Sequence, residues 1–91
     1  MQTRTINRQD SNIVLDCRTP LARAQALLCD ISETGCRIEL FDGYVQRGST
    51  IFLEVDARNE LAGQIVWVRG NEAGVHFSHK LSHAVRTALE L

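Results

Sequence analysis

Residues 30–40 (DISETGCRIEL) carry the clearest local signal for the fold. The first six residues combine an acidic residue, a hydroxyl and a glycine, which are the residue types that form tight turns. From Cys36 to Leu40, apolar and polar residues then alternate, as in a strand with one buried face. The stretch therefore predicts a tight turn that leads into a half-buried β-strand.

The rest of the chain repeats this pattern of short apolar runs separated by Gly, Asp, Asn and Ser. A helix competes with a strand in the second of these runs, because alanine and leucine also favour helices. We expect six strands, over Asn12–Arg18, Ala22–Ile31, Cys36–Leu40, Ile51–Val55, Leu61–Val68 and Ala73–Phe77.

The last part of the chain changes its period. Apolar residues recur at helical spacing at Leu81, Val85, Ala88 and Leu89. We expect a short amphipathic helix there that covers the mouth of a barrel. The sequence thus predicts an all-β fold, a six-stranded antiparallel β-barrel with a C-terminal α-helix. We expect a single domain over 1–91, with a flexible polar arm at 1–10, the barrel at 11–78 and the helix at 80–91.

Size and composition narrow the possible functions. The chain has 91 residues and a formal net charge of −1, which argues against a binder of polymeric nucleic acid. Its apolar runs are far shorter than the ~20 residues that span a bilayer. The first residues do not resemble a signal peptide, so we expect a cytoplasmic protein without membrane insertion. The odd set Cys17, Cys29 and Cys36 predicts reduced thiols in the core, with a redox or metal role as the alternative.

Arg4 and Arg8 are the first candidate ligand-binding residues. A spacing of four places both side chains on one face, either in an extended chain or in a helical turn. Two guanidinium groups side by side repel each other unless an anion lies between them. The alternative is a pair of solvated arginines in a polar arm.

The turn at residues 30–35 supplies the other candidates. Asp30 and Ser32 share one face, Ile31 points into the core, and Gly35 permits a positive φ or a close backbone approach. The Ser32 hydroxyl can bind a phosphate or ribose oxygen, or it can cap the turn. An ordinary structural turn is the alternative for this segment.

Together, these two elements fit a ligand that contains guanine and phosphate. The O6 and N7 acceptors of guanine suit an arginine, and its N1 and amino donors suit a carboxylate such as Asp30. Phosphates also favour the planar fork of arginine.

The arrangement resembles the PilZ domain family. Arg4-Thr5-Ile6-Asn7-Arg8 matches the family's Arg-x-x-x-Arg motif, and residues 30–35 match its [Asp/Asn]-x-Ser-x-x-Gly motif. Residues 63–68 and 73–77 also look like the paired late strands of the family, so the resemblance covers about residues 4–79. The additional arginine that family members often carry before the first motif is Thr3 here.

The resemblance implies a split-barrel-type β-barrel that binds the bacterial second messenger cyclic di-GMP and needs no cofactor. The implied ligand-binding residues are Arg4, Arg8, Asp30, Ser32 and Gly35. The arm would become ordered over the ligand, and the domain, as a monomer or homodimer, would signal through a protein partner. A PilZ-fold adaptor that binds proteins and no nucleotide is the main alternative.

Other readings have weaker support in the sequence. We expect no enzyme, because the sequence contains no nucleophile elbow, metal cluster or phosphate-binding glycine loop. His79 and His83 lie four apart on the predicted helix, with His76 nearby, but a solvated face explains them better than a metal site. Trp67 is expected to pack in the core or the barrel wall and not to serve as a stacking platform.

Overall fold

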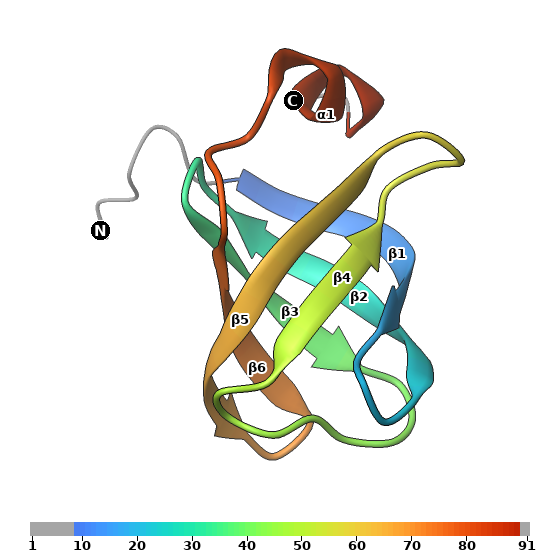
Figure 1. The fold of residues 1–91 in the computed structure, drawn as a ribbon, viewed down its shortest axis with the longest axis vertical. Coiled ribbons are helices and arrows are strands. Elements are labelled where there is room, and N and C mark those ends of the chain that lie inside the picture. The colour runs from blue at the N-terminus through green and yellow to red at the C-terminus, as the bar shows by residue number, and fades with distance from the viewer. Residues whose placement is uncertain (1–8, 90–91) are drawn as a thin grey trace.

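The protein, seen in a computed structural model, is described for residues 9–89, with side chains from residue 13 onward. This part of the chain forms six antiparallel strands and one helix, and the strands close into a barrel in the order β1-β2-β3-β6-β5-β4 (Figure 1). The elements are β1 (Gln9–Arg18), β2 (Arg23–Ile31), β3 (Gly35–Leu40), β4 (Thr50–Glu54), β5 (Glu60–Arg69), β6 (Glu72–Phe77) and α1 (His83–Ala88). The predicted six-stranded barrel with a C-terminal helix is therefore confirmed.

Apolar side chains that alternate with polar ones along the strands fill the interior of the barrel. Along β3, Ile38 and Leu40 are buried, and opposite them on β6 the buried residues are Ala73, Val75 and Phe77. The residues that point inward from the other strands complete a single core, which includes Leu15, Cys17, Ala26, Leu28, Ile31, Ile51, Leu53, Leu61 and Ile65. Burial of this apolar surface is the main force that stabilises the closed sheet.

Shifts in register in β2 and β5 change which side chains face outward. One lies in β2 between Leu28 and Asp30, so that Leu28 and Ile31 both reach the core although they are three residues apart. Another lies in β5 between Ile65 and Trp67. Strict alternation would place Trp67 inside with Ile65, but the extra residue turns it to the outer wall, where it is half-buried.

The N-terminal strand starts earlier than the sequence suggests. Pairing of Gln9 with Ile31 and of Asp10 with Asp30 extends β1 beyond the predicted start at Asn12. A register shift between Asp10 and Ile13 separates this short stretch from the regular part of the strand. The sequence pattern did not predict this extension, because residues 9–11 are polar and backbone pairing needs no apolar side chains.

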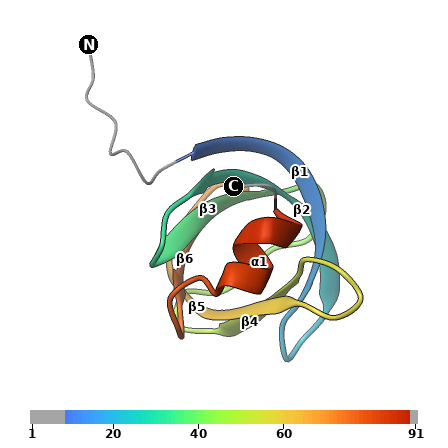
Figure 2. The same cartoon turned by 90° about the horizontal axis from the view of Figure 1, so that it is seen from above.

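The helix covers one end of the barrel, as expected (Figure 2). Leu81, Val85 and Leu89 are buried against the core cluster. The helix begins later than the predicted start at residue 80, because Ser82 caps it: the Ser82 hydroxyl accepts a hydrogen bond from the Val85 amide at 3.1 Å. His79 therefore precedes the helix, and the expectation that His79 and His83 share a helical face is wrong. In residues 9–89, no helix has the length and apolarity that crossing a membrane requires.

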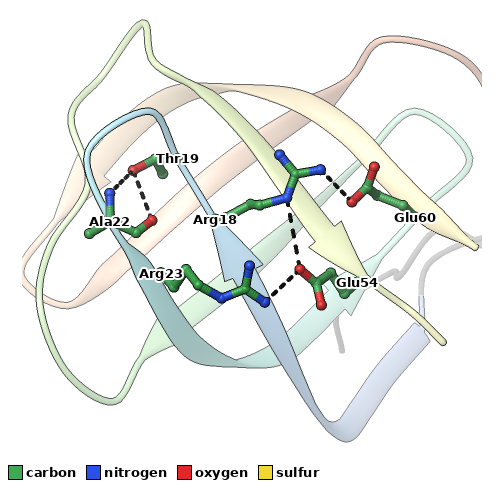
Figure 3. Close-up of polar contacts among 6 residues, drawn as sticks. All are labelled: Arg18, Thr19, Ala22, Arg23, Glu54 and Glu60. Atoms are coloured by element: carbon green, nitrogen blue, oxygen red, sulfur yellow. Dashed lines mark hydrogen bonds and ion pairs between the residues drawn. The ribbon is translucent and has the colours of Figure 1, made fainter. Parts of the chain in front are cut away.

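The contact between β1 and β4 completes the barrel and consists of only three residue pairs. On its outer surface, the Arg18 guanidinium donates to Glu60 at 2.9 Å and lies 3.8 Å from Glu54, while Arg23 donates to Glu54 at 2.9 Å (Figure 3). Arg18 also lies 4.3 Å from the centre of the Phe52 ring. Each exposed pair contributes only about 0–1 kcal/mol, so the network supplements the backbone pairing and does not replace it.

Candidate ligand-binding site at the β2–β3 turn

The turn between β2 and β3 is built from its own polar groups. The Ser32 amide donates to the Gly35 carbonyl at 2.8 Å, which closes the turn. The Ser32 hydroxyl donates to the same carbonyl at 3.3 Å and accepts from the Thr34 amide at 3.4 Å. The hydroxyl therefore caps the turn in this structure, which is the structural alternative that the sequence left open.

Gly35 is required by a close backbone approach and not by a positive φ. A Cβ atom at this position would lie 2.5 Å from the Val75 carbonyl oxygen of the neighbouring strand β6. The glycines with positive φ in the described part of the chain are Gly43, Gly48 and Gly70. Of the two roles that the sequence allowed for Gly35, the structure thus selects the second.

Backbone bonds also tie the turn to the end of the barrel that α1 covers. The Phe77 amide donates to the Thr34 carbonyl at 2.8 Å, and the Leu81 amide donates to the Glu33 carbonyl at 3.2 Å. Since Phe77 ends β6 and Leu81 leads into α1, a displacement of the turn would be felt by both elements. The turn is therefore a fixed corner of the barrel, because hydrogen bonds join it to the end of β6 and to the segment that precedes α1.

Asp30 lies in a short chain of charges on the outer wall. Arg37 of β3 donates from Nε to the Asp30 carboxylate at 3.0 Å, and its Nη1 atom lies 3.3 Å from Glu72 of β6. The Asp30 side chain is only 14% exposed, so this pairing orients a carboxylate that is largely removed from water. The hydrogen bond to Asp30 raises the pKa of the Arg37 guanidinium, which stays charged.

The register of the sheet continues this row across the barrel. Asp30 pairs with Arg37, Arg37 pairs with Gly74, and Gly74 pairs with Trp67 of β5. Any Cβ on Gly74 would collide with the indole ring, so the ring lies directly over this glycine. The Arg69 guanidinium lies 5.8 Å from the Trp67 ring centre. An acid, a guanidinium and a half-buried aromatic ring thus follow one another on one face.

The structure brings Asp30, Ser32 and Gly35 into one corner, while Arg4 and Arg8 lie outside the described residues. The nearest described part of the arm is Gln9, which follows Arg8 in the chain and pairs with Ile31, the residue before Ser32. The chain therefore enters β1 beside the corner that carries the second motif.

Sequence reasoning missed Arg37, Glu72 and Trp67 as neighbours of this corner. Arg37 could have been found, because a hairpin that pairs residue 31 with residue 36 also pairs residue 30 with residue 37. The position of Trp67 could not, since it depends on the register shift in β5.

The prediction that the cysteines lie in the core is met by Cys17, at the far end of β1, while Cys36 is partly buried against the core and Cys29 is only half-buried. Burial raises the pKa of the Cys36 thiol, and also that of Cys29 and Cys17, so all three favour the protonated form. All three are free of disulfides. Among the described residues, no group of three or more His, Cys, Asp or Glu side chains is placed to hold a metal ion.

Comparison with known families finds a match that covers nearly the whole chain. The family described as PilZ domain matches residues 2–91. PilZ domains are receptor domains for cyclic di-GMP and act by binding. No curated protein matches the chain.

Proposed function

The chain belongs to the PilZ domain family, and from this premise we propose that it is a receptor for cyclic di-GMP that signals to a protein partner. The observation that carries the proposal is the position of the Asp30 carboxylate. Arg37 holds it at 3.0 Å on the outer wall, in the corner where the strand that follows Arg8 pairs with β2. Gln9 already pairs with Ile31 at this corner, and Arg8 is the residue before it. Since consecutive Cα atoms are about 3.8 Å apart, we expect Arg8 to be within reach of the corner.

Each proposed contact has a chemical reason. The N1 and amino groups of guanine are donors, and the Asp30 carboxylate is the matching acceptor. Arg4 and Arg8 would bind the O6 and N7 edge and the phosphates, for which a guanidinium fork is suited. Gly35 keeps the turn close to β6, so its contribution is to the shape of the corner.

Ser32 is limited by the bonds that it already makes. Its proton is donated to the Gly35 carbonyl, so a bond to a phosphate oxygen would require that 3.3 Å contact to open. Its second lone pair can accept from a ligand hydroxyl or amino group without any change in the turn. We therefore assign Ser32 the role of an acceptor that contacts the ribose or the base.

Isothermal titration of the intact protein with cyclic di-GMP tests the proposal directly, with cyclic di-AMP as the matched control ligand. Trp67 is the single tryptophan of the chain and stands in the same register row as Asp30, so its fluorescence offers a second readout. Heat and fluorescence changes that saturate with cyclic di-GMP, but do not occur with cyclic di-AMP, support the proposal. If cyclic di-GMP changes neither the heat nor the fluorescence, the alternative of a PilZ-fold adaptor that binds proteins and no nucleotide is favoured.

Binding is expected to increase amide protection in residues 4–10. The arm contains two cations that repel each other until an anion lies between them, so the ligand should order it. Hydrogen exchange with and without cyclic di-GMP measures this change, with residues 56–59 as an internal control in a distant exposed loop. Equal protection of residues 4–10 in the two states would contradict a signal that depends on arm ordering.

Discrimination between guanine and hypoxanthine should depend on the Asp30–Arg37 pair. Hypoxanthine lacks the amino donor, so Asp30→Ala should weaken cyclic di-GMP far more than cyclic di-IMP. Arg37→Met keeps the aliphatic stem but releases the carboxylate, and we expect about a tenfold loss of discrimination, on the order of 1.4 kcal/mol. Titration of both ligands measures the ratio, and Arg58→Met in an exposed loop is the control. An equal loss of affinity for both ligands would indicate a purely structural role for Arg37.

The compartment and the oligomeric state belong to the same proposal. We propose a cytoplasmic location, a compartment in which thiols such as Cys17, Cys29 and Cys36 stay reduced. We expect a monomer or homodimer that reaches its effector through a separate surface.

A further inference from the structure

A cleft of about 420 Å³ lies at the other end of β2 from the Asp30–Gly35 corner. It is lined by Asp16 of β1, by residues 23–25 at the start of β2 and by residues 41–43, which follow β3. The loops that follow β1 and β3 lie at the end of the barrel away from α1 (Figure 1). The Phe41 amide donates to the Gln25 carbonyl at 3.2 Å, which joins the two sides of the cleft.

Apolar side chains are exposed in and beside this cleft. The Phe41 side chain, on its lining, is 56% exposed. Leu21 in the β1–β2 turn and Tyr44 after Gly43 are 76% and 74% exposed. The Thr19 hydroxyl accepts from the Ala22 amide at 3.3 Å and donates to the Ala22 carbonyl at 3.4 Å, which holds the turn that presents Leu21 (Figure 3). Large exposed apolar groups gathered around a cleft are typical of surfaces that bind another protein.

The charge of the cleft favours a cation. Asp16 accepts a hydrogen bond from Gln25 at 3.1 Å and Asp42 accepts from the Gly43 amide at 2.8 Å, but neither forms an ion pair with any described residue. Arg23, the basic residue of the lining, is already paired with Glu54 at 2.9 Å (Figure 3). Within the described part of the chain, two carboxylates thus have no cationic partner beside an exposed aromatic ring.

We propose that this cleft binds an arginine side chain from a segment of a partner protein. A guanidinium can stack on the Phe41 ring and donate to the Asp16 and Asp42 carboxylates, a combination that a compact ammonium matches less well. Exposed Leu21 and Tyr44 then contact apolar residues that flank the arginine. Because a free polyamine has no such apolar flanks, we propose a polypeptide as the ligand. The cleft would serve as the output surface of the domain, separate from the corner proposed for nucleotide.

A titration of ¹⁵N-labelled protein with the peptide acetyl-Leu-Arg-Leu-amide tests the proposal. The same peptide with citrulline is the matched control, because citrulline keeps the shape of arginine without its charge. We expect the arginine peptide to shift the amide signals of residues 23–25 and 41–43 in a saturable way. The citrulline peptide should bind at least tenfold more weakly.

Variants distinguish the cleft from other acidic surfaces. Asp42→Asn and Phe41→Ala should each weaken the arginine peptide about fivefold or more, while Glu39→Gln on the outer face of β3 should have no effect. Equal shifts with both peptides, or unchanged binding by Asp42→Asn, would overturn the proposal. Spermidine that binds the same residues as tightly as the peptide would also overturn it, since the cleft would then recognise free cations. Loss of cyclic di-GMP binding affects none of these outcomes, so the two proposals fail independently.

Discussion

Replacing Arg8 with alanine is expected to weaken the binding of cyclic di-GMP by about 30-fold or more. Truncation of one partner in a close contact between charged groups costs about 2–5 kcal/mol, and 1.4 kcal/mol corresponds to a factor of ten. Arg8 is the motif arginine that directly precedes Gln9, and Gln9 pairs with Ile31 beside the corner. Calorimetric titration of parent and variant measures the difference.

The matched control is Arg58→Ala, which removes an arginine from an exposed loop far from the corner in sequence and in the sheet. It should bind like the parent, and both variants should unfold at the parent's temperature. Arg8→Lys separates charge from geometry, because lysine keeps the charge but cannot make a bidentate contact. Parent-like affinity of Arg8→Ala, with the fold intact, would show that the first motif does not bind the ligand.

Gly35→Ala is expected to destabilise the barrel by about 2 kcal/mol, because overpacking of a close contact typically costs 1–3 kcal/mol. The new Cβ would lie 2.5 Å from the Val75 carbonyl oxygen, which is backbone and cannot move without the strand. For a domain of this size, that loss lowers the midpoint of thermal unfolding by roughly 8–16 °C. Thermal unfolding followed by circular dichroism measures it.

Thr34→Ala is the control for this change. Thr34 is the exposed neighbour of Gly35 in the same turn, and alanine leaves its backbone bonds possible. We expect less than about 0.5 kcal/mol for this variant. A Gly35→Ala protein as stable as Thr34→Ala would mean that β3 and β6 can separate freely, and the corner would then not be a fixed part of the site.

Much of the fold could be predicted from local patterns. Alternation from Cys36 to Leu40 and helical spacing from Leu81 to Leu89 follow directly from where the side chains must point to reach a core. The turn at residues 30–35 is specified by its own residue types, and its candidates Asp30, Ser32 and Gly35 do lie together. Arg4 and Arg8 stay predictions, since the described residues begin at Gln9.

The amino-acid sequence by itself thus determined the strands, the turns and the amphipathic helix, since these depend on residues close together in the chain. Only the tertiary structure decided that Arg37 also reaches Glu72 of β6 and that Trp67 lies over Gly74. It also decided that Phe41 borders a cleft with Asp16. Most of these neighbours come from segments that are distant in sequence, and the single-residue shift in β5 sets the pairing of Trp67 with Gly74. One extra residue moves every later side chain to the opposite face, and no local pattern records where that residue is inserted.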